Sequence, residues 1–262
     1  MTNCGQAHSI AMAALPLLMF FAAGCPVTQS QDTPVAEFRC VEPATGGGYY
    51  LYVPSGYDAN RPWPLVVTLH GTHGFDDAEA QVREWKALSE QDGFIVLAPQ
   101  VSSPQGILPV ADASMQERLA EDEKQVLAEL AEVKRKYTIE PRAVLITGFS
   151  AGGYPMYHVG LRHPELFTAL SARSCNCDLQ DLKAIPMTDA ARKMPMQIFF
   201  GRSGINPVSS TMNPIAGQSW AAYKFLRDNR CFKAEIKPID GGHERRPEVA
   251  LRFWKRFWPK KP

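Results

Sequence analysis

The 262-residue sequence is 45% hydrophobic and 21% charged, and its formal net charge at pH 7 is +1. This hydrophobic content is enough for a buried core and, with the moderate charge content, excludes an intrinsically disordered chain. Because the near-neutral balance comes with no stripe of Lys or Arg, nucleic acid is not an expected partner. The length suits one large α/β domain or two small ones.

The first 35 residues are expected to precede the folded domain. Residues 10–24 are almost wholly apolar, and a run of this length is too short to cross a bilayer comfortably but suits the hydrophobic region of a signal peptide. Its end, Ala22-Ala23-Gly24-Cys25, resembles a bacterial lipobox, which implies cleavage before Cys25 and a lipid on that residue. We therefore predict a signal peptide over 1–25, a linker over 26–35, and export as a lipid-anchored or secreted protein. A buried helix is the alternative.

From residue 36 to residue 262 the pattern predicts one domain in which strands and helices alternate. Continuous apolar, β-branched runs such as 65–69 are typical of strands buried on both faces. The alternation predicts an α/β fold with a mostly parallel, twisted sheet and helices on both faces, and residues 179–193 could form a small cap. Strands are predicted over 38–41, 49–53, 65–69, 94–98, 143–146, 167–171, 196–200 and 234–239, and helices over 78–91, 115–137, 154–162, 215–229 and 244–258.

The segment Gly148-Phe149-Ser150-Ala151-Gly152 follows a predicted strand and precedes a predicted helix. In this context the pattern Gly-x-Ser-x-Gly places a serine on a sharp, strained turn with its hydroxyl exposed above the sheet. Glycine is needed on both sides because a side chain there would collide with the neighbouring strand and helix. Ser150 is therefore the candidate nucleophile, and a glycine-rich turn with an incidental serine is the alternative.

A serine nucleophile needs an adjacent base, and histidine is the usual one near neutral pH. His243 lies between the last predicted strand and the last helix, which places it at the carboxyl edge of the sheet, where Ser150 also lies. His158 and His163 lie on or just after the helix that follows the serine and point away from it. We therefore predict His243 as the base, with a structural histidine as the alternative.

An oxyanion hole requires backbone N–H groups aimed at the developing negative charge. One is expected from Ala151, at the start of the helix after the nucleophile. The second is expected from the turn that follows the strand 65–69, with Thr72 as the candidate and His73 as the alternate. His70, which opens this turn, is interpreted as structural.

The combination of His70-Gly71-Thr72, Gly148-Phe149-Ser150-Ala151-Gly152-Gly153 and Gly242-His243 resembles the α/β-hydrolase family. Within it the chain is similar to esterases related to polyhydroxybutyrate depolymerases and feruloyl esterases. The resemblance implies the α/β-hydrolase fold and hydrolysis of small or polymeric carboxylic esters through an acyl-enzyme, with no cofactor and no metal.

The acidic member of the triad does not occupy its usual place. Enzymes of this family usually carry it in the loop after the strand that here is 196–200, at the position of Gly204. No Asp or Glu occurs from residue 201 to residue 222. Asn206 lies nearby and could hold an imidazole by a hydrogen bond, but it supplies no charge.

An acid one strand earlier is the alternative. Asp178 lies just after the predicted strand 167–171 and is the favoured candidate, and Asp181 is a weaker one. Asp240 is too close to His243 in sequence to reach its Nδ1 comfortably. The open possibilities are therefore Asp178, Asn206 or no acid.

The missing acid motivates a second hypothesis, a non-catalytic surface binding module on a hydrolase scaffold, because a fold does not guarantee an activity. A serine peptidase is a third and weaker one. After removal of Cys4 and lipidation of Cys25, the even number of remaining cysteines in an exported chain permits two disulfides. These are Cys40, Cys175, Cys177 and Cys231, and free buried thiols are the alternative.

Overall fold

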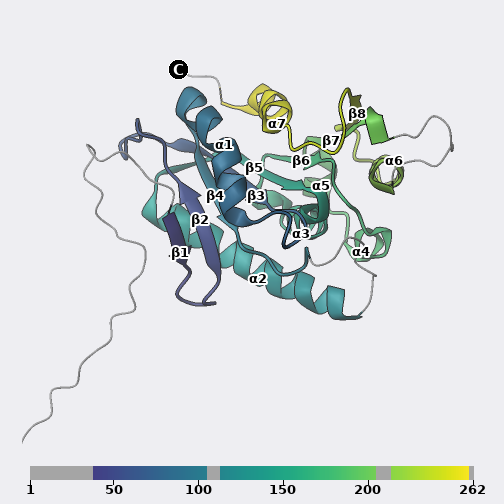
Figure 1. The fold of residues 1–262 in the computed structure, drawn as a ribbon, viewed down its shortest axis with the longest axis horizontal. Helices are drawn as coiled ribbons and strands as arrows, with labels where there is room; N and C mark the ends of the chain where they lie inside the picture. The colour runs from purple at the N-terminus through teal and green to yellow at the C-terminus, as the bar shows by residue number, and fades with distance from the viewer. Residues whose placement is uncertain (1–37, 105–112, 205–213, 260–262) are drawn as a thin grey trace, which may run out of the picture.

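The computed structural model describes residues 38–104, 113–204 and 214–259, which form an α/β fold (Figure 1). The predicted signal peptide, Cys25 and the linker over 26–35 lie outside the described residues. Within the described ranges, no helix combines the length and the apolar character needed to cross a membrane.

One eight-stranded sheet organises the fold, in the spatial order β1-β2-β4-β3-β5-β6-β7-β8. The pairs β1–β2 and β2–β4 are antiparallel, and all the others are parallel, so the predicted mostly parallel sheet is confirmed. The strands are β1 (Phe38–Val41), β2 (Gly48–Tyr52), β3 (Trp63–Leu69), β4 (Ile95–Pro99), β5 (Ile139–Phe149), β6 (Ala169–Arg173), β7 (Met196–Gly201) and β8 (Ala234–Ile239).

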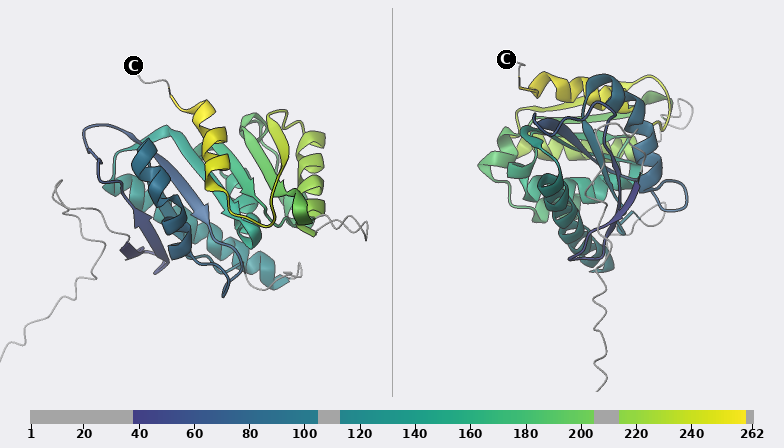
Figure 2. Two further views of the ribbon diagram at one scale, coloured as in Figure 1. Left: turned by 45° about the horizontal axis from the view of Figure 1, so that its top comes forward. Right: turned by 90° about the vertical axis from the view of Figure 1, so that its left-hand side faces the viewer.

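Helices cover both faces of the sheet, as predicted (Figure 2). α1 (Ala78–Asp92) and α7 (Pro247–Trp254) pack on one face. α2 (Ala113–Lys136), α3 (Gly153–Arg162) and α6 (Pro214–Asp228) pack on the other. The segment predicted as a small cap forms two short helices, α4 (Leu179–Ala184) and α5 (Asp189–Lys193).

The central strands are apolar throughout because each of their faces meets a layer of helices. In β3, Leu65 and Val67 belong to the hydrophobic cluster under α2 and α3, whereas Val66 belongs to the cluster under α1 and α7. Successive side chains of a strand point to opposite faces, so an alternating pattern would have left one face of this strand polar. Each such buried side chain contributes about 1.5–3 kcal/mol relative to an exposed one.

Most predicted boundaries lie within two residues of the observed ones, and two elements differ by more. The strand predicted over 143–146 extends over Ile139–Phe149, because its exposed first half carries Pro141 and Arg142, which hide it from a hydrophobic pattern. The last helix, predicted from residue 244, begins at Pro247. Arg246 precedes it with a left-handed φ of 44°, so the helix cannot extend further back.

The two disulfides that the cysteine count permits do not form among Cys40, Cys175, Cys177 and Cys231, and the alternative of free buried thiols holds for three of them. Cys175, Cys177 and Cys231 are free and buried, and none of them is bonded to Cys40. The Sγ of Cys175 donates a hydrogen bond to Gly148 O at 3.0 Å. Burial raises the pKa of Cys175 to about 12, so its thiol stays protonated and serves as a packing group.

Candidate active site

Ser150 lies at the tip of a strained turn between β5 and α3. Its φ is 52°, in the left-handed region that a serine rarely adopts. A Cβ added at Gly148 would lie 2.4 Å from Gly152 O, and one added at Gly152 would lie 2.4 Å from Leu69 O. These close approaches explain why residues 148 and 152 are both glycine. They also show that the turn packs directly against the carboxyl end of β3.

A cavity of about 580 Å³ opens over this turn. Its walls combine four apolar side chains with three ionisable groups and the candidate nucleophile. Ser150 and His243, which are far apart in the sequence, both line it, so the structure brings the predicted nucleophile and base to one cavity. The lining residues are Thr72, Phe75, Asp76, Phe149, Ser150, Asn176, Pro214, Ile215, His243 and Arg245.

The imidazole of His243 packs on the residue before the nucleophile. Its ring stacks on that of Phe149, with the centroids 4.7 Å apart and an interplanar angle of 25°. Partial desolvation and the positive charge of Arg245 lower the pKa of His243. The neutral form, which can accept a proton, is therefore favoured at neutral pH. The side chains of His243 and Ser150 both line the cavity, but within the described residues no hydrogen bond joins them. Catalytic hydrogen bonds often tighten only when substrate binds.

The loop 71–76, which we call the oxyanion loop, lies directly beside the nucleophile. A Cβ at Gly71 would be 3.2 Å from Ser150 Cβ. Thr72, which lines the cavity, turns the loop by accepting hydrogen bonds on its carbonyl oxygen from Phe75 N at 3.1 Å and Asp76 N at 3.0 Å. Ala151 is buried and follows Ser150 in the first helical turn.

His70, the last residue before this loop, stabilises it by hydrogen bonding. The ring is fully buried, and burial lowers the pKa of His70. The neutral ring donates from Nδ1 to Gly71 O at 2.7 Å, and its Nε2 accepts from Gln100 Nε2 at 3.2 Å. These contacts agree with the structural role expected of His70.

Within the described residues no hydrogen bond or ion pair joins Asp178 to His243. Asp178 caps α4, where its Oδ1 accepts a hydrogen bond from Gln180 N at 2.8 Å, and it is absent from the residues that line the cavity. The weaker candidate, Asp181, pairs with His158 Nδ1 at 2.9 Å. Within the described residues no hydrogen bond or ion pair joins a carboxylate to His243, and Asn206 lies outside them.

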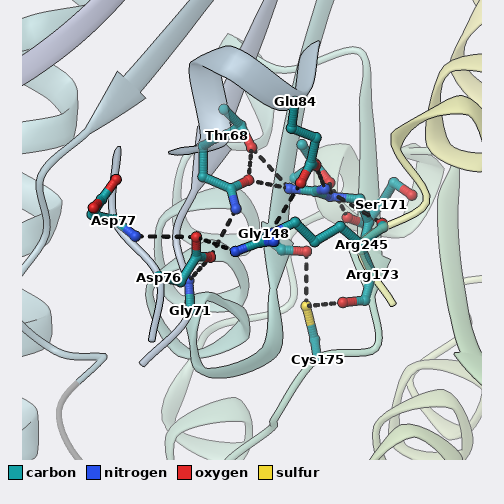
Figure 3. A network of polar contacts seen from close by, with 12 residues as sticks. Thr68, Gly71, Asp76, Asp77, Glu84, Gly148, Ser171, Arg173, Cys175 and Arg245 are labelled. Atoms are coloured by element: carbon teal, nitrogen blue, oxygen red, sulfur yellow. Dashed lines mark hydrogen bonds and ion pairs between the residues drawn. The ribbon is translucent and has the colours of Figure 1, made fainter. Parts of the chain in front are cut away.

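Sequence reasoning missed a polar network that joins the loops around the cavity (Figure 3). Arg173, at the end of β6, is fully buried, pairs with Glu84, and donates to Thr147 Oγ1 at 3.0 Å and Thr68 Oγ1 at 2.9 Å. Burial raises the pKa of Glu84 while the charge of Arg173 opposes that shift. The signal available in the sequence was an arginine ending an otherwise small, apolar strand.

Arg245 connects this network to the cavity, which it lines. It lies two residues after His243, and its Nη2 donates to Asp76 Oδ1 at 2.7 Å, while its Nε is 3.2 Å from Glu84 Oε2. The Asp76 carboxylate also accepts from Gly71 N at 2.7 Å and from Gln81 Nε2 at 2.8 Å. One buried carboxylate therefore ties the oxyanion loop to the loop 240–246 that carries His243, which we call the histidine loop.

A family comparison agrees with this arrangement. The model of the family described as "Putative esterase" matches residues 47–230. The chain belongs to this esterase family. The match runs from β2 to the end of α6 and includes Ser150 and the oxyanion loop, whereas His243 lies beyond its end.

Curated relatives of this esterase cover different shares of it. Probable feruloyl esterase C of Aspergillus niger is 25% identical over 221 residues, which cover 82% of this chain and 71% of the relative. Acetylxylan esterase A of Aspergillus ficuum is 27% identical over 145 residues, or 54% of this chain and 47% of the relative. Poly(3-hydroxyalkanoate) depolymerase C of Paucimonas lemoignei is 30% identical over 124 residues, or 45% and 28%. The chain thus spans about half the length of the acetylxylan esterase and less of the depolymerase.

Solved structures share the fold of this esterase. The ferulic acid esterase AmCE1/Fae1A of Anaeromyces mucronatus superposes with a TM-score of 0.60 at 16% identity, covering 88% of this chain and 94% of that one. A thermostable esterase gives a TM-score of 0.57 at 21% identity, with coverages of 86% and 63%. The chain therefore has the α/β-hydrolase fold that was predicted.

Proposed function

We propose that this protein is a serine esterase that cleaves carboxylic esters with Ser150 as nucleophile and His243 as base. The observation that carries the proposal is that a strained, left-handed Ser150, His243 and the oxyanion loop all border one cavity. Membership of an esterase family supports ester hydrolysis. The feruloyl, acetylxylan and polyester specificities belong to the relatives and indicate the range of esters to test.

The proposed reaction has two halves. Ser150 Oγ attacks the ester carbonyl carbon while His243 takes the hydroxyl proton, and the carbonyl oxygen gains the negative charge. The N–H groups of Ala151 and Thr72 hold this oxyanion. His243 then gives its proton to the departing alkoxide, which leaves an acyl-enzyme. Water repeats the sequence on the acyl-enzyme and releases the carboxylic acid.

No described residue supplies the third member of a triad in this proposal. Asp178 caps α4 through its Oδ1, whereas its Oδ2 is buried with no hydrogen-bond partner among the described residues. In its place the electrostatic neighbour of His243 is Arg245, which favours the neutral imidazole. We therefore assign proton transfer to Ser150 and His243 as a pair, with the stacked Phe149 ring as the support of the imidazole.

The apolar part of the cavity suits the acyl group of the ester. Phe149 and Ile215 contribute hydrophobic surface, and Phe75 is 79% exposed at the rim. We further propose export, on the strength of the apolar run 10–24, with a lipid on Cys25 as the means of membrane attachment.

Hydrolysis of a short p-nitrophenyl ester tests the proposal. Ser150→Ala is expected to abolish turnover while the circular dichroism spectrum and the melting temperature stay unchanged or rise slightly, because alanine removes only the hydroxyl. Ser203→Ala, at an exposed serine outside the cavity, is the matched control and is expected to keep full activity. Full turnover by Ser150→Ala would refute the assignment. A wild-type protein that neither turns over esters nor reacts with a fluorophosphonate would favour the non-catalytic binding module.

A further inference from the structure

A second cavity, of about 510 Å³, lies beside the catalytic one and shares a wall with it. Phe75 and Asp76 line both cavities. The second cavity lies over the antiparallel end of the sheet, between β1, β2 and the start of α1. Its lining residues are Arg39, Gly48, Tyr50, His73, Gly74, Phe75, Asp76, Asp77, Ala80 and Gln100.

The lining of this second cavity is polar without a dominant charge. Arg39 offers a cation, and Tyr50, His73 and Gln100 offer groups that donate or accept hydrogen bonds. The lining also has two carboxylates: Asp76 already accepts from Arg245, and Asp77 already accepts from Ala80 N at 2.7 Å. A phosphate or sulfate site would gather several cations, and among the described residues no three His, Cys, Asp or Glu side chains are grouped so as to hold a metal ion. A mixture of single donors and acceptors suits a neutral ligand with several hydroxyl groups.

Some of these groups are available and others are fixed. Arg39 is exposed and makes no hydrogen bond or ion pair with any other described residue, so its guanidinium is free to bind. Gln100 is fixed, because its Nε2 lies 3.2 Å from the Nε2 atoms of both His70 and His73. The rim carries the Phe75 ring, 79% exposed, and such an aromatic face can pack on the C–H face of a sugar ring.

We propose that this second cavity is a subsite for the hydroxyl-rich alcohol half of the ester, such as a sugar unit, while the acyl group occupies the catalytic cavity. This inference rests on the proposed function. His243 protonates the leaving alcohol, and Arg245 connects the histidine loop to Asp76, the wall that both cavities share. In this proposal the alcohol half extends from the catalytic cavity past Phe75 and Asp76, the two residues that line both cavities, into the second cavity.

Gly48 provides a specific way to block the subsite. It lies on the cavity floor, on the same face of β2 as Tyr50, and has no Cβ. A Cβ added there would have Cys40 O at 4.0 Å as its nearest neighbour, and its φ is not in the left-handed region. Gly48→Leu would therefore fill the cavity without a backbone clash. Gly56→Leu is the matched control, because a Cβ at this exposed position meets nothing within 4 Å and lies outside both cavities.

The experiment compares two acetyl esters, p-nitrophenyl acetate and an acetylated xylo-oligosaccharide. Gly48→Leu is expected to raise the KM for the oligosaccharide ester by roughly ten-fold or more while leaving kcat/KM for p-nitrophenyl acetate within two-fold. Arg39→Ala, which removes a free cation, is expected to raise the same KM by roughly three-fold to ten-fold, the effect of one hydrogen bond. Gly56→Leu is expected to change neither substrate.

Equal effects of Gly48→Leu on the two esters, or no effect on either, would overturn the subsite. So would a wild-type protein that hydrolyses p-nitrophenyl acetate but not the oligosaccharide ester. A binding measurement separates this failure from failure of the esterase proposal. In NMR titration, Ser150→Ala protein is expected to bind an unesterified xylo-oligosaccharide, and Ser150→Ala/Gly48→Leu protein is expected not to. Equal binding, or none by either protein, would refute the subsite whatever the esterase assay shows.

Discussion

Replacing Asp76 with Asn is expected to lower both stability and activity, because this one carboxylate joins two loops of the proposed active site. Its side chain is 2% exposed. It accepts hydrogen bonds from Gly71 N at 2.7 Å, from Gln81 Nε2 at 2.8 Å and from Arg245 Nη2 at 2.7 Å. An asparagine keeps one oxygen for the first two donors, but its Nδ2 would face the guanidinium of Arg245 and could not accept from it.

The expected loss of stability follows from the contact removed. A hydrogen bond to a charged group contributes about 1.5–3 kcal/mol. Arg245 is 38% exposed and keeps Glu84 as a neighbour, so water and that carboxylate compensate part of the loss. We therefore expect about 2 kcal/mol, which in a domain of this size corresponds to a fall in Tm of about 4–8 °C. Freeing the oxyanion loop is expected to lower kcat by about ten-fold to a hundred-fold, somewhat less than deletion of an oxyanion donor.

Scanning calorimetry and p-nitrophenyl ester hydrolysis measure the two effects. Asp240→Asn is the matched control, because Asp240 also pairs with an arginine, Arg202 at 3.4 Å, but is 97% exposed. Exposed pairs contribute about 0–1 kcal/mol, so this variant is expected to keep its Tm within about 2 °C and its full activity. If Asp76→Asn behaved like Asp240→Asn, the inference that Asp76 couples the two loops would be refuted.

Three further outcomes follow from the same geometry. Because partial desolvation and Arg245 lower the pKa of His243, and because the neutral imidazole is the base, kcat/KM should fall only as the pH drops through a value below the ordinary 6.5; an acid limb at or above 6.5 would contradict this. Gly152→Ala places a Cβ 2.4 Å from Leu69 O, so it should yield little folded, soluble protein, whereas Gly56→Ala should express normally; a stable, active Gly152→Ala protein would disprove the close packing. Because Cys175 is buried and burial raises its pKa to about 12, a thiol reagent should label it in denaturant but not in native protein, and rapid native labelling detected by peptide mass spectrometry would count against that burial.

Most of the fold could be predicted from the sequence because the central strands are continuous apolar runs. Such runs bury both faces and, alternating with amphipathic helices, allow few topologies. The exposed start of β5 could not be found in this way, since Pro141 and Arg142 lack the pattern. The disulfide prediction failed for a different reason. An even count of cysteines permits pairs, but only the three-dimensional positions of the sulfur atoms decide whether a bond forms, and Cys175 and Cys177 stay free.

The positions of Ser150 and His243 at the cavity could be predicted because a motif, or a place directly after a strand, determines where a residue lies in the sheet. Ser150 follows from Gly-x-Ser-x-Gly, and His243 follows from its place after the last strand. Arg245 and Asp76 could not be found this way, because their pairing joins residues that only the folded sheet brings together. Asp178 was chosen by its place after a strand, but its carboxylate serves the N-terminus of α4. A position just after a strand therefore predicts that a residue lies at the edge of the sheet where the active site forms. Its role there depends on the contacts that its side chain makes.

The most direct test of the central claim is covalent labelling by a fluorophosphonate, read by intact mass and then by peptide mapping. The proposed pairing of Ser150 with His243 predicts a single adduct on Ser150, formed at least a hundred-fold more slowly in His243→Gln protein of unchanged Tm, because loss of the base lowers nucleophilicity by about 10²-fold or more. An adduct on another serine, or labelling of Ser150 at the same rate without the imidazole, would contradict it.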